Sequence, residues 1–151
     1  MKIAKAKGIC LNYGPCEYHS NVITGACKDC DGIKVPVYVH NSIIGDFCHY
    51  HPDGYAKLKD TKYGVIAEVK ITNDLIVSII EELNKSNDSN DLKFGCMVNH
   101  LKKSENGDIV YGMIRYVDVT YRGLGDKAVF DILEEWLWKI ILGKEVDLKK
   151  K

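Results

Sequence analysis

The sequence predicts an α+β protein: an antiparallel sheet covered on one face by two helices, preceded by a small cysteine-rich module. Three observations lead to this prediction. Four of the six cysteines fall within the first 30 residues, residues 63–71 alternate apolar and polar side chains as a strand does, and two later segments repeat apolar residues at helical spacing. We divide the 151 residues into a module over residues 1–36, an α+β domain over residues 37–145 and a frayed basic tail over residues 146–151.

Charge and hydropathy exclude several classes of protein. The 21 basic and 21 acidic residues cancel, so bulk charge alone does not hold this chain to DNA, although a local basic patch remains open. The N-terminus is charged and lacks the apolar core of a signal peptide, and no stretch approaches the roughly 20 apolar residues of a membrane span. We therefore expect a cytoplasmic protein with no membrane partner, whose clustered thiols stay reduced.

The first half of the predicted domain contains two strands and a helix. Residues 33–40 are β-branched and apolar, and Pro36 suggests an edge strand. Residues 63–71 read as a half-buried strand with Glu68 and Lys70 on the polar face. Asn73 can cap the helix that follows. The apolar stripe of that helix consists of Leu75, Ile76, Ile79, Ile80 and Leu83.

The second half predicts a hairpin and a last helix, which completes the order β-α-β-β-α. Residues 92–101 and 109–120 are strand candidates, and Asn106 and Gly107 between them are a strong hairpin signal. Asp126 can cap a helix that ends at Gly143. The apolar residues of this helix are Val129, Phe130, Leu133, Trp136, Leu137, Ile140 and Ile141. The helix is either a core helix with a solvated acidic face or a homodimer surface formed around Trp136 and Trp138.

The cysteines predict a metal site. Five residues separate Cys10 from Cys16, and two separate Cys27 from Cys30, with glycines beside both pairs. Two such turns can close four thiolates around a tetrahedral Zn²⁺. This arrangement resembles the small zinc-ribbon modules over residues 7–36, which implies a structural Zn²⁺ but no particular partner. Two disulfides or a redox C-x-x-C pair are the alternatives.

The other cysteines and histidines give weaker signals. Cys48 and His51 have the spacing of a metal knuckle, and with His19 they could build a second metal site. The alternative is a turn with a partly buried cysteine and solvated histidines. Cys96 lies within a strand candidate and reads as a small buried hydrophobic residue.

A second resemblance concerns residues 52–70. Pro52 and Asp53 precede Glu68 and Lys70 at a spacing similar to that of the PD-(D/E)XK nucleases. The resemblance implies that Asp53 and Glu68 share a Mg²⁺ and that Lys70 orients or deprotonates the attacking water. The alternative is an ordinary strand with Glu68 and Lys70 exposed to water, because such a strand has the same sequence pattern.

The sequence therefore supports two functions and does not decide whether the chain is an enzyme. The first is a small zinc-binding adaptor, regulator or inhibitor that contacts a protein or a nucleic acid. The second is a Mg²⁺-dependent nuclease that uses Asp53, Glu68 and Lys70. Neutral charge favours a protein partner over a nucleic acid.

Overall fold

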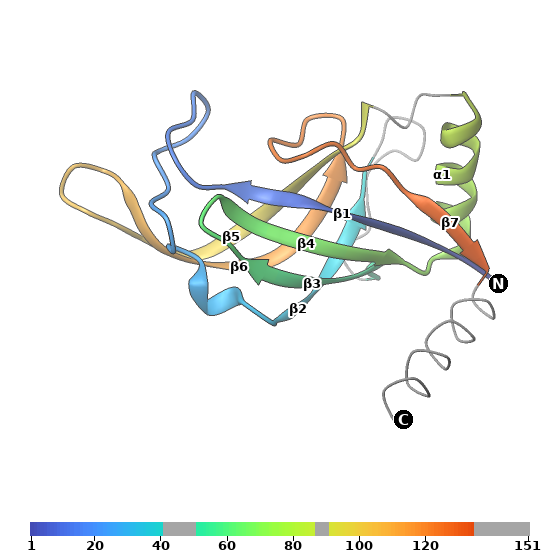
Figure 1. The fold of residues 1–151 in the computed structure, drawn as a ribbon, viewed down its shortest axis with the longest axis horizontal. Coiled ribbons are helices and arrows are strands. Elements are labelled where there is room, and N and C mark those ends of the chain that lie inside the picture. The colour runs from blue at the N-terminus through green and yellow to red at the C-terminus, as the bar shows by residue number, and fades with distance from the viewer. Residues whose placement is uncertain (41–50, 87–90, 135–151) are drawn as a thin grey trace, which may run out of the picture.

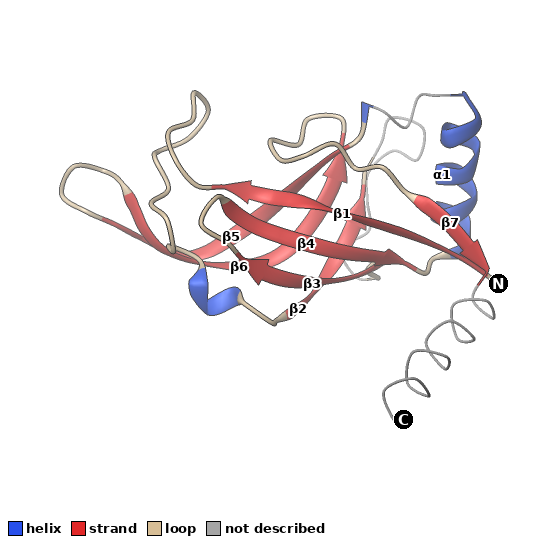
Figure 2. Cartoon of the chain, viewed as in Figure 1, coloured by secondary structure: helices blue, strands red, loops and turns tan. Residues whose placement is uncertain are grey.

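The computed structural model describes residues 1–40, 51–86 and 91–134. Their main element is a seven-stranded mixed sheet accompanied by one α-helix and one short 3₁₀ turn (Figures 1 and 2). The strands are β1 Lys2–Asn12, β2 Lys34–Val39, β3 Gly54–Asp60, β4 Gly64–Ile71, β5 Lys93–Lys103, β6 Ile109–Thr120 and β7 Asp131–Glu134. The helix α1 spans Asp74–Ser86 and the 3₁₀ turn spans Lys28–Cys30.

The sheet has the order β5-β6-β2-β3-β4-β1-β7 and curls back on itself. Strands β2 and β6 run parallel, and the other pairs are antiparallel. Strand β1 lies in front of β5 in Figure 1, and the backbone of Asp126 hydrogen-bonds to residues of both strands. We call the line along which β1 and β5 face each other the seam. The rolled sheet encloses one main hydrophobic core.

The strands form where the sequence alternates. In β4 the side chains of Val65, Ala67, Val69 and Ile71 are buried, whereas Glu68 is exposed, which confirms the period-two prediction. Strand β2 is also confirmed, but its predicted edge position is wrong, because it lies between β6 and β3. Pro36 is tolerated there because pairing with β6 begins only at Val37.

Helix α1 begins as the sequence predicts. The Asn73 side chain accepts hydrogen bonds from the backbone N–H groups of Leu75 (3.0 Å) and Ile76 (3.3 Å). The buried face consists of Ile76, Val77, Ile80 and Leu83. Leu75 of the predicted stripe is 65% exposed, because the helix turns Val77 inward instead.

The β5–β6 hairpin is confirmed, with Gly107 in the left-handed conformation at φ 87°. The hairpin is regular only near its base. Register shifts follow Met97, and His100 has a positive φ of 56°. The outer half of β5 is mostly exposed.

The prediction of a balanced α+β fold with two helices on one face is wrong, since the described residues form mostly sheet with one α-helix. The last helix, expected from Asp126, is extended backbone over its described part and ends in β7. The burial there alternates, with Ala128 and Phe130 buried and Val129 exposed. Strand β7 pairs with residues 2–5 of β1 and so satisfies backbone groups that a helix would leave open.

Parts of that prediction lie outside the described residues, among them Trp136, Trp138 and the homodimer surface expected there. The strands on either side of the boundary expected near residue 36, β1 and β3, both pair with β4 in the same sheet. Within the described ranges, no helix is long and apolar enough to cross a membrane.

Candidate functional site: a pocket at the seam

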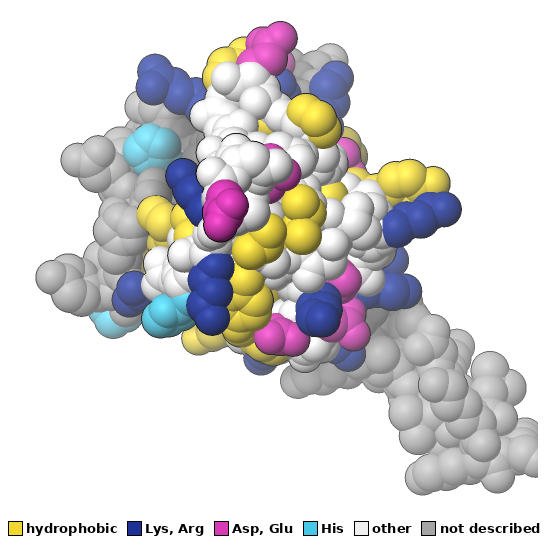
Figure 3. Space-filling model, turned by 90° about the vertical axis from the view of Figure 1, so that its left-hand side faces the viewer, with side chains coloured by type: hydrophobic (Ala, Val, Ile, Leu, Met, Phe, Trp, Pro, Cys, Tyr) yellow, Lys and Arg dark blue, Asp and Glu magenta, His cyan; other side chains and the backbone are white. Residues whose placement is uncertain are grey.

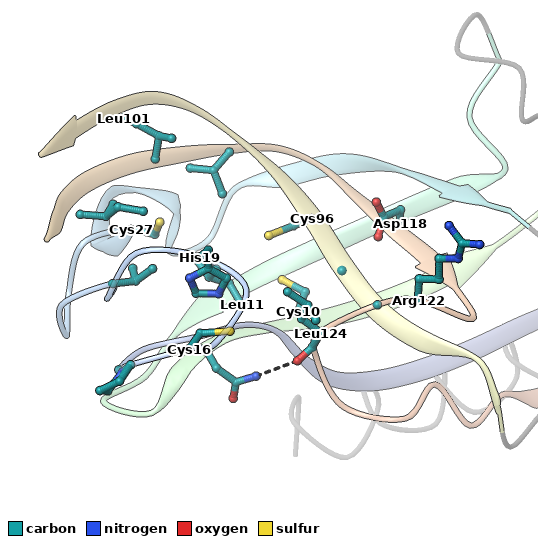
Figure 4. A pocket seen from close by; sticks show the side chains of 18 of the residues that line it. Cys10, Leu11, Cys16, His19, Cys27, Cys96, Leu101, Asp118, Arg122 and Leu124 are labelled. Carbon is teal, nitrogen blue, oxygen red and sulfur yellow. Dashed lines mark hydrogen bonds between the residues drawn. The ribbon is translucent and has the colours of Figure 1, made fainter. Parts of the chain in front are cut away.

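A cavity of about 720 Å³ opens along the seam (Figure 4). Its walls come from the end of β1, the loop that follows it, the middle of β5 and the end of β6. Apolar side chains dominate the lining, which is typical of ligand pockets. The lining side chains that matter below are Cys10, Leu11, Asn12, Cys16, His19, Cys27, Cys96, Val98, Leu101, Asp118, Arg122 and Leu124.

The closed stretch of the seam fixes one end of this pocket. The backbone N–H of Asp126 donates to the carbonyl of Ile9 (2.8 Å), and the backbone N–H of Phe94 donates to the carbonyl of Asp126 (2.9 Å). The Asp126 carboxylate accepts from the N–H of Ile9 (2.8 Å). Gly125 leaves no room for a side chain, since a Cβ there would lie 2.1 Å from the Ile9 carbonyl oxygen. A glycine followed by an aspartate therefore joins β1 to β5.

The loop after β1 forms the outer wall of the pocket. Gly14 and Val22 pair across this loop, and the N–H of Ile23 donates to the carbonyl of Ile109 (3.0 Å) at the start of β6. Tyr13 anchors the start of the loop because its hydroxyl donates to Asp60 (2.5 Å) and accepts from the N–H of Cys27 (3.2 Å). Burial, followed by the Asp60 contact, raises the pKa of Tyr13. Tyr13 therefore stays protonated as the donor to Asp60.

Two cysteines line the pocket from different strands. Figure 4 shows Cys10 on β1 and Cys96 on β5 with their side chains in the pocket wall. The neighbouring Cys10, together with burial, raises the pKa of the Cys96 thiol. The thiol of Cys10 donates to the carbonyl of Val65 at 3.5 Å. A weak sulfur hydrogen bond therefore links β1 to β4.

A half-buried carboxylate lies at the polar end of the pocket. Asp118 lies between Tyr38 of β2 and Gly95 of β5 in the sheet register, and its Oδ1 occupies the space above Gly95. Burial raises the pKa of Asp118, and the nearby charge of His40 partly offsets this effect. Arg122 follows β6 on the same side of the pocket. The pocket thus combines apolar walls with an acidic and a basic group at one end.

A second thiol pair lies beneath the pocket. Cys27 and Cys30 flank the 3₁₀ turn, and both are buried. The interaction between the two thiols raises the pKa of Cys27 and lowers that of Cys30 to about 7. The Cys30 sulfur also accepts from the backbone N–H of Ile114 at 3.2 Å, which further stabilises its thiolate.

The zinc-ribbon prediction is wrong. Within residues 1–40, 51–86 and 91–134, no group of three or more His, Cys, Asp or Glu side chains is arranged to hold a metal ion. Cys10 belongs to a long strand of the sheet, whereas Cys16 lies on the loop at the pocket's outer wall. The spacing of the four cysteines reflects a strand and a separate turn, not two knuckles of one ribbon.

The second predicted metal site is only partly placed by the structure. Cys48 lies outside the described residues, and His51 is exposed. His19 is half-buried in the pocket-wall loop, where its Nδ1 lies 2.7 Å from the carbonyl oxygen of Ser20.

The predicted nuclease residues do not converge. Asp53 is buried and has a structural role, because its carboxylate accepts hydrogen bonds from the N–H of Val39 (2.8 Å) and from the side chain of Asn73 (3.3 Å). Glu68 is exposed and lies 3.5 Å from the Lys7 amine. In the β3–β4 register Glu68 faces Lys57, about 13 Å along the strand from Asp53. Lys70 lies opposite Tyr55.

Few sequence signals indicate the pocket residues. Asp118 and Arg122 lie at the end of a predicted strand, where charged residues ordinarily point to water. One signal was present: Asp118 interrupts a run of valines at positions 117 and 119, and a carboxylate there must lie on the face opposite the core. Cys96 was correctly expected to lie on a strand, but Cys10, which lines the same pocket, was assigned to a metal.

Comparison with known proteins gives a fold and no family. No family model matches the chain, and no curated protein does. Among solved structures, the crystal structure of KSHV protease in complex with a hexapeptide phosphonate inhibitor superposes with a TM-score of 0.51. The match has 10% sequence identity and covers 91% of this chain and 68% of the protease. At this identity the likeness concerns the fold alone.

Proposed function

We propose that this protein binds an extended polypeptide segment at the seam, with an apolar side chain of that segment filling the pocket. The observation that supports the proposal is the pocket itself, a largely apolar cavity of about 720 Å³ that ends in two charged groups. Such a cavity is large enough for a leucine- or phenylalanine-sized side chain and its flanking backbone.

The strand beside the pocket suits a peptide. Along residues 9–12, β1 pairs with β4 on one side, and residues 10–12 border the pocket. A strand edge next to an apolar pocket is the arrangement used in β-strand addition, where backbone hydrogen bonds give affinity and the pocket gives specificity. The similar fold of a protease bound by a hexapeptide inhibitor agrees with a peptide as the occupant.

The proposal is binding and not cleavage. A cysteine nucleophile reacts as its thiolate, whereas the neighbouring Cys10 and burial raise the pKa of Cys96. Cys96 is therefore not prepared as a nucleophile. Cys10 is buried and its thiol donates to the Val65 carbonyl.

The charged end of the pocket sets a polarity for the peptide. Asp118 can accept a hydrogen bond from an amide or an amine, and Arg122 can donate to a carbonyl or a carboxylate. Asp118 and Arg122 lie on the same side of the pocket, so both can bond to the peptide backbone next to the apolar side chain that fills the pocket. Figure 3 shows the end of the molecule that carries the β5–β6 hairpin, where hydrophobic side chains gather between charged ones.

A matched pair of variants tests the proposal. Leu124 lines the pocket and is 50% exposed, and Leu75 lies on α1 and is 65% exposed. The probes are fluorescein-labelled hexapeptides that differ only in a central Ala, Val, Leu or Phe, and fluorescence anisotropy reports their binding. We expect affinity to rise with side-chain size, to fall at least about tenfold in Leu124→Glu, and to stay within about twofold in Leu75→Glu.

Either of two results would overturn the proposal: no peptide binds, or both variants lose affinity equally. Mass spectra of the peptides after incubation provide the second readout, because cleaved peptide would show that the protein hydrolyses the peptide and does not only bind it.

A nucleic-acid partner and a Mg²⁺-dependent nuclease remain predictions from the sequence. The separation of Asp53 from Glu68 gives the nuclease no support.

A further inference from the structure

The outer surface of four neighbouring strands gathers lysines. Strands β2, β3, β4 and β1 lie side by side in the sheet, and alternate residues of these strands are buried in the core. In Figure 1, strands β1, β4 and β3 lie in front of β5 and β6, so their outer surface turns toward the viewer. The residues that the four strands place between the buried positions include Lys5, Lys7, Lys34, Lys57, Lys59 and Lys70. We call this surface the lysine face.

The strand register arranges these lysines in rows. Lys5 of β1 lies opposite Lys70 of β4, and Lys70 lies opposite Tyr55 of β3. The next row, two residues along the strands, consists of Lys7, Glu68, Lys57 and Lys34. Since neighbouring strands lie about 4.8 Å apart, the four strands place the rows within a patch roughly 15 Å wide. Burial, followed by the charge of Lys70, lowers the pKa of Lys5, as expected where positive charges crowd together.

Few acidic groups balance this charge. The four strands, all of them fully described, contain seven lysines and only two acidic residues, Asp60 and Glu68. Asp60 accepts a hydrogen bond from the Tyr13 hydroxyl, and Glu68 lies 3.5 Å from the Lys7 amine. The 21 basic and 21 acidic residues of the whole chain cancel, so the acidic residues concentrate elsewhere. Zero net charge therefore hides a surface on which positive charge is segregated.

An aromatic ring lies among the lysines. Tyr55 is 45% exposed, and the Lys34 amine lies 4.7 Å from the centroid of its ring. A base that stacks on this ring would bring its phosphate within reach of an amine. Single-stranded nucleic acids bind to proteins through this combination, in which bases stack on aromatic rings and basic side chains follow the phosphates.

The same residues favour a nucleic acid over a lipid surface. Binding at a membrane surface requires large apolar side chains that enter the acyl region, in addition to positive charge. Along the fully described strands β1 to β4, Tyr55 is the only large hydrophobic side chain that is exposed. The lysine face therefore offers charge and one stacking surface, but no apolar anchor.

We propose that the lysine face binds single-stranded nucleic acid, with the phosphates along the lysine rows and a base stacked on Tyr55. The pocket at the seam is lined by other side chains, which come from the end of β1, the loop after it, β5 and β6. Peptide binding at the pocket and nucleic-acid binding at the lysine face can therefore succeed or fail independently.

A double substitution tests the contribution of the lysines. The probe is a fluorescein-labelled oligothymidylate of about 20 nucleotides, and fluorescence anisotropy reports its binding to the full chain at several salt concentrations. Each lysine that contacts a phosphate of a single strand adds about 0.7 to the slope of log affinity against log salt. We expect Lys57→Gln with Lys59→Gln to weaken binding at least about fivefold at low salt and to reduce this slope by about 1.4.

The matched control is Lys102→Gln with Lys103→Gln, which removes the same charge at an exposed place outside the lysine face. Both residues lie at the outer end of β5, on the hairpin that projects beyond β3 and β4 in Figure 1. We expect this variant to stay within about twofold of the wild type, because it leaves every proposed phosphate contact in place. Circular dichroism reports whether both variants are folded.

A second pair of variants tests the stacked base. Tyr55→Ala should weaken binding at least about fivefold with little change in the salt slope, because it removes a stacking surface and no charge. Tyr18→Ala, in the loop after β1 where Tyr18 is 77% exposed, should leave binding unchanged.

Four results would overturn the proposal. They are no binding of the oligonucleotide, equal losses in the two lysine variants, tighter binding of a duplex of the same length, and binding to phosphatidylserine vesicles in place of the oligonucleotide. The last result would assign the lysine face to a membrane surface.

Discussion

The seam between β1 and β5 is closed along one stretch and open along the next. In the closed stretch, Asp126 bonds to Ile9 and Phe94, and Gly125 fits where no side chain could. Immediately beyond this stretch, Cys10 and Cys96 of the same two strands line the pocket. The difference shows that this fold forms a cavity because the rolled sheet is bridged at one point and left unbridged beside that point.

The open stretch coincides with irregular structure in β5. Near Phe94, β5 is buried and pairs in register with β6, whereas beyond Met97 the register shifts and side chains become exposed. Bulges of this kind bend a strand and turn its side chains. The pocket therefore lies where β5 leaves the regular sheet.

The largest effect is expected where the closed stretch is tightest. Gly125→Ala places a Cβ against the carbonyl oxygens of Ile9 and Phe94, which are backbone atoms that cannot move without breaking the bridge. We expect a loss of about 3 kcal/mol in the free energy of unfolding, measured in urea. The control is Gly107→Asn, where nothing lies within 4 Å and asparagine tolerates the positive φ. Equal losses in both variants would show that the seam is not tight at Gly125.

A smaller loss is expected at the pocket's outer wall. Tyr13→Phe removes the hydroxyl that bonds to Asp60 and to the N–H of Cys27, and leaves both groups without that partner. We expect a loss of about 2 kcal/mol in the free energy of unfolding. Tyr63→Phe is the matched control, because Tyr63 is 67% exposed. A loss below about 0.5 kcal/mol in Tyr13→Phe would mean that the loop does not depend on this anchor.

The bridge carboxylate contributes less, because it is exposed. Asp126→Ala removes the acceptor of the Ile9 N–H but keeps the backbone bonds of residue 126. We expect a loss of about 1 kcal/mol. Asp131→Ala, at an exposed position of β7, should change stability by less than about 0.5 kcal/mol. The same urea titration measures both, and a bridge held by backbone bonds alone would make the two variants equal.

Much of the sheet could be predicted from the sequence, and the site could not. The alternation in β4, the Asn73 cap and the Asn106–Gly107 hairpin are local signals, and the structure follows them. The seam depends on contacts between residues far apart in the chain, such as Ile9 with Asp126. Local patterns carry no information about such contacts. The apolar residues at positions 129, 130 and 133 fit a helix when only local spacing is considered. In the structure this segment leads into β7, which pairs with the edge of β1.

The cysteines show the same limit more sharply. Their spacing matched a metal ribbon, yet Cys10 lies within a strand and lines the same pocket as Cys96, 86 positions later in the chain. Cys27 and Cys30 are the one pair that both sequence and structure bring together. The short spacing of Cys27 and Cys30 places them at the two ends of one turn, but the zinc site predicted from that spacing is wrong.

The smallest effect concerns pH and the open stretch. Burial raises the pKa of Asp118, so the folded protein binds this proton more readily than the unfolded chain. Between the unfolded pKa of about 3.9 and the raised folded pKa, the contribution of Asp118 to the free energy of unfolding must therefore fall as pH rises. Above that pH window the contribution stays constant.

Asp118→Asn removes this titration while keeping the shape of the side chain. The quantity to measure is the unfolding free energy of the wild type minus that of the variant, from urea titrations between about pH 3.5 and pH 8. We expect this difference to decrease with rising pH through the window and then to level off. A difference that increases instead would mean that His40 outweighs burial at Asp118, and the polar end of the pocket would then bind as a fixed anion.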